Sequence, residues 1–201
     1  MSEKANSNAG FYPGHAWLEI NNLTDSFVEV GYYTAHAGEY LSVGLWGNIT
    51  NIEGLHAGVW YNRESYSYIN GGGLLNYTRM GQLINLEELQ LISDIAKKEN
   101  DEYGLLYYNC CHFAISAWNE VSAPNQKLYA ALIISALRPP LIYNDTIRIL
   151  ETADFLTLSP LDVRDAIIET FPFKYETVSN LFLADTYGYY NGESMVLYNI
   201  N

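Results

Sequence analysis

Two stretches near the N-terminus alternate between hydrophobic and polar residues, a pattern typical of a β-strand with one buried face. Residues 14–20 form the first stretch and residues 27–33 the second, and a turn-rich segment lies between them. The residues of the first stretch divide between two faces: Ala16, Leu18 and Ile20 on one, His15, Trp17 and Glu19 on the other. The pattern predicts an antiparallel hairpin over residues 14–33.

Three later segments carry weaker strand signals: residues 54–62, 64–69 and 193–199. The second of them is followed by a glycine-rich segment, NGGG. That segment lacks the lysine and the following helix of a phosphate-binding loop, so no nucleotide site is predicted there.

Helical spacing of the hydrophobic residues begins after Asn85. The apolar positions recur every three or four residues: Leu86, Leu89, Ile92, Ile95 and Ala96. Asn85 is a suitable N-cap, and Glu88 three residues later completes a capping-box pattern. The segment KKEND places cations in the last turn, so a helix is predicted to end there.

A second helical stripe follows in the segment NCCHFAISAWNEV. Its apolar face consists of Cys110, Phe113, Ala114, Ala117, Trp118 and Val121. His112, Ser116 and Asn119 lie on its polar side. Asn109 is a natural N-cap, which makes Cys110 the first residue of the predicted helix.

The pattern changes again after Pro124. Residues 128–137 predict a buried helix, and Ser159 precedes a short helix with Pro160 at its first position. The division expected is a flexible tail over residues 1–10, a core over 11–123, and a C-terminal elaboration over 124–201 packed on that core. The whole is expected to be one α+β domain.

Composition excludes several classes of function. The net charge is −13, and the ten Lys and Arg residues are scattered. Neither a nucleic acid nor an anionic membrane surface is an expected partner for such a chain. The most apolar run, residues 128–137, is half as long as a bilayer requires, so stable membrane insertion is not expected. The 18 tyrosines and four tryptophans indicate aromatic sheet faces or a groove for a sugar or peptide.

The first ten residues are polar and lack the apolar core of a signal peptide. Synthesis in the cytoplasm is therefore expected. The two cysteines are adjacent, which disfavours a disulfide between them. No CxxC pair is present to hold zinc, and neither a metal nor a cofactor is predicted.

Cys110 occupies a position that favours a reactive thiolate. The N-terminus of a helix presents amide protons and a partial positive charge, and both stabilise a negative sulfur. Its own amide could also donate to an oxyanion. The alternative is that Cys110 and Cys111 are both small buried hydrophobic residues.

A cysteine nucleophile needs an imidazole partner, and the chain offers four: His15, His36, His56 and His112. His112 lies on the same helix as Cys110 and two residues on, so their side chains should diverge. His15 begins a strand, where it could line a groove or remain a strand-edge residue.

The segments GHAWLEI and YNCCHFAISAWN, in that order, resemble the circularly permuted NlpC-type branch of the papain-like cysteine hydrolases. NCCHFA also resembles the NCEHFV pattern of the lecithin:retinol acyltransferase relatives. The resemblance implies a papain-like fold, with an antiparallel sheet packed against the helix that carries the nucleophile. It implies Cys110 as nucleophile, His15 as general base, and no catalytic role for Cys111.

Such families place a polar residue on the next strand to orient the imidazole. If Asp25 and Ser26 form a tight turn in the predicted hairpin, His36 lies opposite His15, and His36 is the favoured third residue. A turn one or two residues earlier places Tyr33 or Tyr32 opposite His15 instead. His56 and Glu19 are the alternatives for the third residue. Glu19 shares a face with His15 but lies about 13 Å along the strand.

The leading functional hypothesis is a cysteine amidase or peptidase. The resemblance implies amide bonds of bacterial peptidoglycan stem peptides as its substrate. An antibacterial effector delivered by a secretion system, with an immunity or secretion-system protein as partner, is one route to such a substrate. The alternatives are an acyltransferase or phospholipase of the lecithin:retinol acyltransferase type, and a non-catalytic binding module on the same scaffold.

Overall fold

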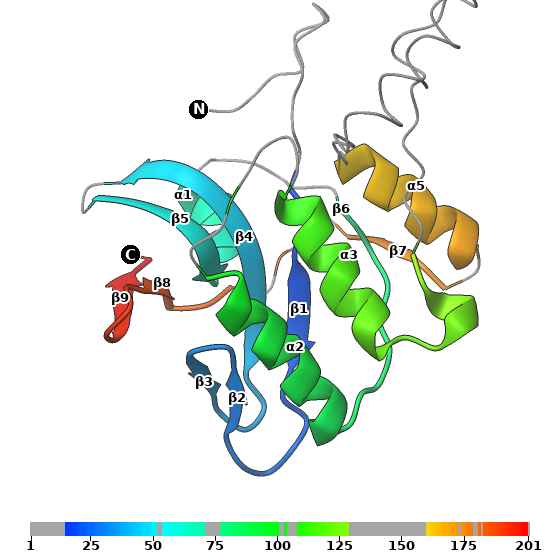
Figure 1. Cartoon of the computed structure of the whole chain (residues 1–201), viewed down its shortest axis with the longest axis horizontal. Coiled ribbons are helices and arrows are strands. Elements are labelled where there is room, and N and C mark those ends of the chain that lie inside the picture. The colour runs from blue at the N-terminus through cyan, green and yellow to red at the C-terminus, as the bar shows by residue number, and fades with distance from the viewer. Residues whose placement is uncertain are drawn as a thin grey trace, which may run out of the picture.

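The chain folds around one five-stranded antiparallel sheet (Figure 1). The computed structural model describes residues 15–51, 54–70, 77–100, 103, 108–128, 160–172, 174–178, 181 and 183–200. The strands of the main sheet, in spatial order, are β1 (Leu18–Asn21), β4 (Tyr40–Asn51), β5 (Gly54–Tyr61), β8 (Thr186–Tyr190) and β9 (Met195–Asn199).

Two small antiparallel pairs flank this sheet. Strands β2 (Val28–Val30) and β3 (Tyr33–Ala35) form one pair, and β6 (Tyr77–Arg79) and β7 (Glu176–Val178) form the other. The turn between β2 and β3 contains Gly31 at a φ of 60°, a left-handed conformation that glycine adopts without strain.

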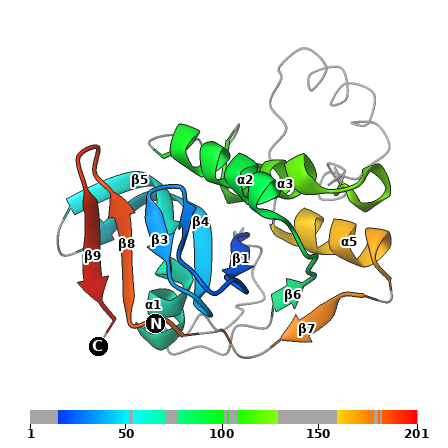
Figure 2. The same ribbon diagram turned by 90° about the horizontal axis from the view of Figure 1, so that it is seen from below.

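Four α-helices lie in the described part of the chain: α1 (Arg63–Asn70), α2 (Leu86–Lys98), α3 (Cys110–Val121) and α5 (Pro160–Thr170). A short 3₁₀ helix, η1 (Pro124–Gln126), follows α3. Helices α2 and α3 lie against one face of the main sheet, α1 lies against the other, and α5 lies beside α3 (Figure 2). Within the described segments, none of the helices is both long and apolar enough to cross a bilayer.

Alternation along β4 separates the two layers. Leu41, Val43 and Leu45 are buried against α2 and α3, together with Phe113 and other core residues. Ser42, Gly44 and Trp46 project to the opposite face, toward α1. This period of two is what the pleat of a strand imposes.

Local sequence signals predicted several elements correctly. Helix α2 begins after Asn85 with the predicted capping box, and α3 begins at Cys110 after Asn109. Helix α5 has Pro160 as its first residue, and β5 and β9 are strands as expected. The α+β class with a mostly antiparallel sheet is confirmed. Residues 1–10, Ser159 and almost all of the predicted 128–137 helix lie outside the described residues.

The predicted hairpin over residues 14–33 is wrong. Strand β1 pairs with β4, Leu18 lying opposite Val43, whereas β2 pairs with β3. The alternating pattern identified both strands, but it did not contain the identity of the partner. The strand predicted over residues 64–69 is also wrong, because this segment belongs to helix α1.

The C-terminal part contributes to the main sheet. Strand β8 pairs with β5, so that Trp60 lies opposite Tyr189, and β9 extends the sheet beyond β8. Strands β8 and β9 are therefore part of the same sheet that contains β1. Phe171, which follows α5, packs against Trp118 of α3.

We expect Phe113→Ala to lower the free energy of unfolding by about 3–5 kcal/mol, because it leaves a cavity in the core between α3 and the sheet. Phe113 is fully buried. Leu86→Ala is the control, since Leu86 on α2 is 63% exposed and its truncation should change stability by about 0.5 kcal/mol or less. Denaturant unfolding measures both, and equal losses would contradict the placement of Phe113.

Candidate active site

The ring of His15 lies between two side chains that come from opposite layers of the fold. His15 lies three residues before Leu18, the first residue of β1. Its Nε2 is 2.9 Å from Oε1 of Glu64, in the first turn of α1. On its other side the ring interacts with the thiol of Cys110, the first residue of α3, and this interaction raises the pKa of His15. Because Nε2 faces Glu64, Nδ1 is the ring nitrogen left for the sulfur.

Both oxygens of the buried Glu64 carboxylate accept hydrogen bonds. It is 2% exposed. Oε2 accepts a hydrogen bond of 2.6 Å from the Ser42 hydroxyl, and Oε1 accepts one of 3.0 Å from the indole N–H of Trp46. With His15, three donors converge on the two oxygens, which is what a buried charge requires to remain ionised.

The turn between β5 and α1 positions Glu64. Asn62 adopts a φ of 57°, a left-handed conformation that asparagine tolerates better than most residues. Its Oδ1 accepts from the backbone N–H of Ser42 at 3.0 Å, and its own N–H donates to the Ser42 carbonyl at 2.8 Å. These two hydrogen bonds fix the start of α1 to β4 at Ser42, the residue whose hydroxyl binds the Glu64 carboxylate.

Gly44 is the floor of the site. A Cβ at this position would overlap Glu64 Oε1, and it would lie 2.7 Å from His15 Nε2 and 3.0 Å from Trp46 Nε1. The close approach of the imidazole and carboxylate to β4 therefore requires a residue without a side chain.

Aromatic rings pack around the pair. The Trp46 ring lies 4.0 Å from the His15 ring, between centroids. Arg63, buried beside Glu64, lies over Trp46 and over three further rings at 4.3 to 5.8 Å: Trp60, Tyr66 and Tyr187. Cation–π contacts of this kind hold Trp46 in place and, through its N–H, hold Glu64 as well.

The electrostatics favour an ion pair. Burial would lower the pKa of His15, but hydrogen bonds and charge from Cys110 and Glu64 raise it to about 9. Burial would raise the pKa of Glu64, yet the His15 contact and the Ser42 hydroxyl hold it below its usual range. A hydrogen bond between the two cysteine sulfurs, together with the His15 ring and the Ala16 amide, holds the pKa of Cys110 far below its usual range against burial. Both shifts favour a thiolate on Cys110 and an imidazolium on His15.

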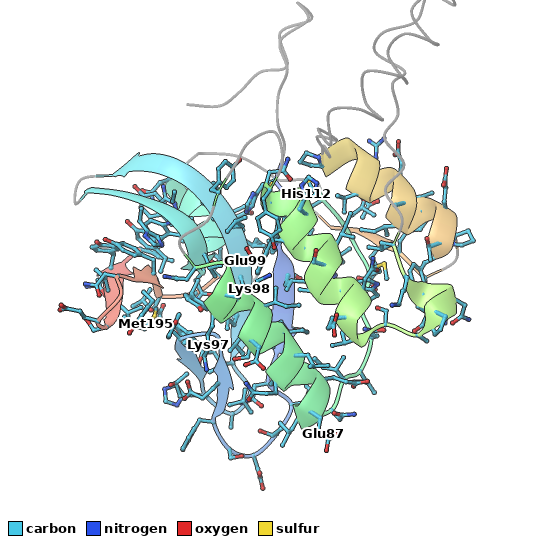
Figure 3. All side chains as sticks on the ribbon, in the orientation of Figure 1. Glu87, Lys97, Lys98, Glu99, His112 and Met195 are labelled. Atoms are coloured by element: carbon cyan, nitrogen blue, oxygen red, sulfur yellow. The ribbon has the colours of Figure 1, made fainter. Side chains whose placement is uncertain are left out.

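The cap of α3 fixes the position of the sulfur. The side-chain oxygen of Asn109 accepts from the amides of Cys111 at 3.0 Å and His112 at 3.4 Å. His112 lies at the N-terminal end of α3 (Figure 3) and completes the cap, because its Nδ1 lies 3.4 Å from the Asn109 amide. His112 is therefore a capping residue, and the cap uses two amides other than that of Cys110.

Of the residues singled out from the sequence, Cys110 and His15 come together. The predicted placement of His36 opposite His15 is wrong, because β1 pairs with β4. His36 is exposed beyond β3, and its carbonyl accepts from Asn22, which follows the far end of β1. That places His36 about 20 Å from His15 along the strand direction.

The other two alternatives also have different partners. The ring of His56, on β5, stacks on Tyr189 at 4.1 Å. Glu19 accepts from the Trp17 indole at 3.2 Å and lies 3.7 Å from Arg79. The carboxylate that touches His15 is Glu64, which the sequence analysis did not consider.

One local signal could have identified Glu64. Tyr66 and Tyr68 alternate with serines, which led to the prediction of a strand. The segment begins, however, with Asn62 and an acidic residue two positions later, which is typical of the first turn of a helix. Recognition of α1 would have placed a carboxylate at a helix start directly after a core strand.

The chain matches no protein-family model, no curated protein and no solved structure. Within the described ranges, no group of three or more His, Cys, Asp or Glu side chains is arranged to hold a metal ion. The chemistry available to the site is that of a buried cysteine, a histidine and a carboxylate in a row.

We expect Gly44→Ala to separate His15 from Glu64. The added methyl group occupies the space between them, so the His15 pKa should fall from about 9 as burial outweighs the lost contact. Stability should fall by about 1–3 kcal/mol. An NMR titration of the His15 ring and a denaturant unfolding curve measure the two effects.

Gly81→Ala is the matched control, because a Cβ there meets no atom within 4 Å. It should leave the His15 titration unchanged. A Gly44→Ala variant whose His15 titrates like the wild type would show that the close packing at β4 does not maintain the pair.

Proposed function

We propose that this chain is a cysteine hydrolase that cleaves amide bonds. Cys110 is the nucleophile, His15 the general acid and base, and Glu64 the positioning residue that orients the imidazole. The observation that carries the proposal is the His15 ring between the Cys110 thiol and the buried Glu64 carboxylate. A nucleophile, a base and an orienting group that contact one another in a row form the arrangement that activates a weak nucleophile.

In the first half of the reaction, the Cys110 thiolate attacks the carbonyl carbon of the amide and a C–S bond forms. The oxyanion that develops accepts a hydrogen bond from the Cys110 amide, at the positive end of α3. The His15 imidazolium then gives its proton to the amide nitrogen as the C–N bond breaks. A free amine leaves, and a thioester on Cys110 remains.

In the second half, neutral His15 removes a proton from water, and the resulting hydroxide attacks the thioester. The C–S bond breaks, the carboxylic acid departs, and the thiolate and imidazolium are restored. Glu64 remains ionised throughout. It keeps Nε2 protonated, so that Nδ1 is the nitrogen that exchanges protons with the sulfur and the substrate.

The arrangement supports membership of the papain-like hydrolases, NlpC-type branch, as the segments around His15 and Cys110 imply. A helix that opens with the nucleophile packs on an antiparallel sheet with the histidine at the end of a strand. The departure from the expected pattern is the third residue. Glu64 lies on the helix after β5 and not on the strand after His15.

The surface beside His15 supports a substrate with flat or apolar faces. Trp17 stacks near the His15 ring with centroids 5.8 Å apart, and the Tyr77 ring lies 5.0 Å beyond Trp17. Both residues are partly exposed. Sugars and peptides pack on such rings, so the stem peptides of peptidoglycan, attached to glycan, are the substrate class we propose.

We expect Cys110→Ala and His15→Ala each to remove nearly all hydrolysis of peptidoglycan stem peptides. Mass spectrometry of the released fragments measures this hydrolysis. The double variant should be little worse than either single one, since the two groups act as a unit. Glu64→Gln should be at least about tenfold more active than His15→Ala. The reason is that the Glu64 side chain only orients the imidazole and exchanges no proton in the reaction.

His36→Ala and Glu19→Gln are the controls and should turn over at the wild-type rate. A Cys110→Ala variant that cleaves normally would end the proposal. Acyl groups transferred from phospholipid vesicles, with intact stem peptides, would favour the acyltransferase alternative. A folded wild-type protein that turns over neither substrate would favour a binding module.

The pH dependence of kcat/KM should be bell-shaped. Activity rises as Cys110 loses its proton well below neutral pH, and it falls as His15 loses its proton near pH 9. Glu64→Gln should move the alkaline limb to lower pH, because it removes a contact that raises the His15 pKa. An alkaline limb unchanged in Glu64→Gln would contradict the coupling between the two residues.

A further inference from the structure

The mechanism above makes no use of Cys111, although this residue touches the nucleophile. Cys111 is completely buried, and its sulfur lies 3.9 Å from the sulfur of Cys110. Successive residues of a helix are rotated by about 100°, so adjacent side chains usually diverge. Here the two sulfurs converge in the first turn of α3, within hydrogen-bonding distance for sulfur.

Only one of the two sulfurs can be the donor when the nucleophile is charged. Cys110 has the His15 imidazole and the Ala16 amide as further partners, and both favour its thiolate. A second thiolate 3.9 Å away would be repelled, so Cys111 keeps its proton. A neutral thiol beside a thiolate is a hydrogen-bond donor.

We propose that Cys111 is a positioning residue whose S–H donates a hydrogen bond to the Cys110 thiolate and stabilises the nucleophile in its anionic form. Its catalytic meaning rests on the proposed hydrolase function, whereas the hydrogen bond is a property of the protein without substrate. The pair is the adjacent-residue counterpart of the CxxC motif, in which the nucleophilic cysteine also has a lowered pKa.

Other titratable groups lie around the two cysteines, and helix α5 packs against them. From the sheet side come His15 and, behind it, Glu64. From the segment before α3 comes Tyr103, whose own pKa burial and the two cysteines raise. Among the side chains of α5 that the structure describes, those in the same buried cluster as the cysteines are apolar: Val163, Ala166 and Ile167.

The proposal predicts two opposite effects of removing the donor. The pH midpoint for thiolate formation should rise, so the thiolate fraction on the acid side falls about tenfold for each unit of the rise, and the net alkylation rate there falls about three- to fourfold. The thiolate that does form is more basic and more nucleophilic. With a Brønsted slope of about 0.4–0.5, its rate at high pH should increase about threefold per unit.

The experiment is the rate of Cys110 alkylation by iodoacetamide against pH in the full chain, with mass spectrometry to locate the label. Cys111→Ala and Cys111→Val should both show the raised midpoint and the raised plateau, and valine keeps the site filled if alanine destabilises the fold. Cys111→Ser retains a hydroxyl donor and should have a midpoint close to that of the wild type.

Val163→Ala is the matched control, because it removes buried volume from the same cluster without removing a donor. It should lower stability and leave the midpoint unchanged. If the alanine and valine variants titrate like the wild type, or if serine shifts the midpoint as far as alanine does, the proposal is overturned. The alkylation experiment uses no substrate. Its outcome is therefore independent of whether the protein proves to be a hydrolase.

Discussion

The hydrogen bond between His15 Nε2 and Glu64 Oε1 is the contact on which the site depends. It joins the edge strand of the sheet to a helix on the far face, and it permits a carboxylate to be buried as a charge. Removal of one partner would leave the other charge buried without compensation, which is far costlier than the loss of a surface ion pair. The Ser42 hydroxyl, the Trp46 indole and the absent side chain at Gly44 all serve this one contact.

Local patterns in the sequence sufficed to place Cys110, the proposed nucleophile, at the start of α3. The N-cap of α3, its apolar stripe and the position of Cys110 are all properties of a dozen consecutive residues. The strand beside His15 was predicted from an equally short segment, although β1 begins at Leu18, three residues after His15. Each of these features is decided by neighbours in the chain, so the sequence predicted them correctly.

The partner of His15 was decided by residues far along the chain. Alternation in residues 14–20 indicates a strand with a buried face. A strand with that buried face can form its backbone hydrogen bonds with β2 or with β4. The chain forms β2 and β3 as a separate hairpin around Gly31, and β1 pairs with β4 instead. The error that placed His36 opposite His15 has this cause. Glu64 was missed for a local reason, because the segment that begins α1 was predicted as a strand.

The assembly of the site from three distant segments links its reactivity to the completion of folding. Glu64 is 49 residues from His15, and Cys110 comes from a third segment, so no fragment of the chain brings them together by local structure. Contacts of such long sequence separation form only after the entropy of closing the intervening loops has been overcome. A newly made or partly unfolded chain therefore carries ordinary, protonated thiols at neutral pH. In the proposed mechanism the sulfur acquires its charge only when the sheet, α1 and α3 have docked, so its reactivity would report on the native state as a whole.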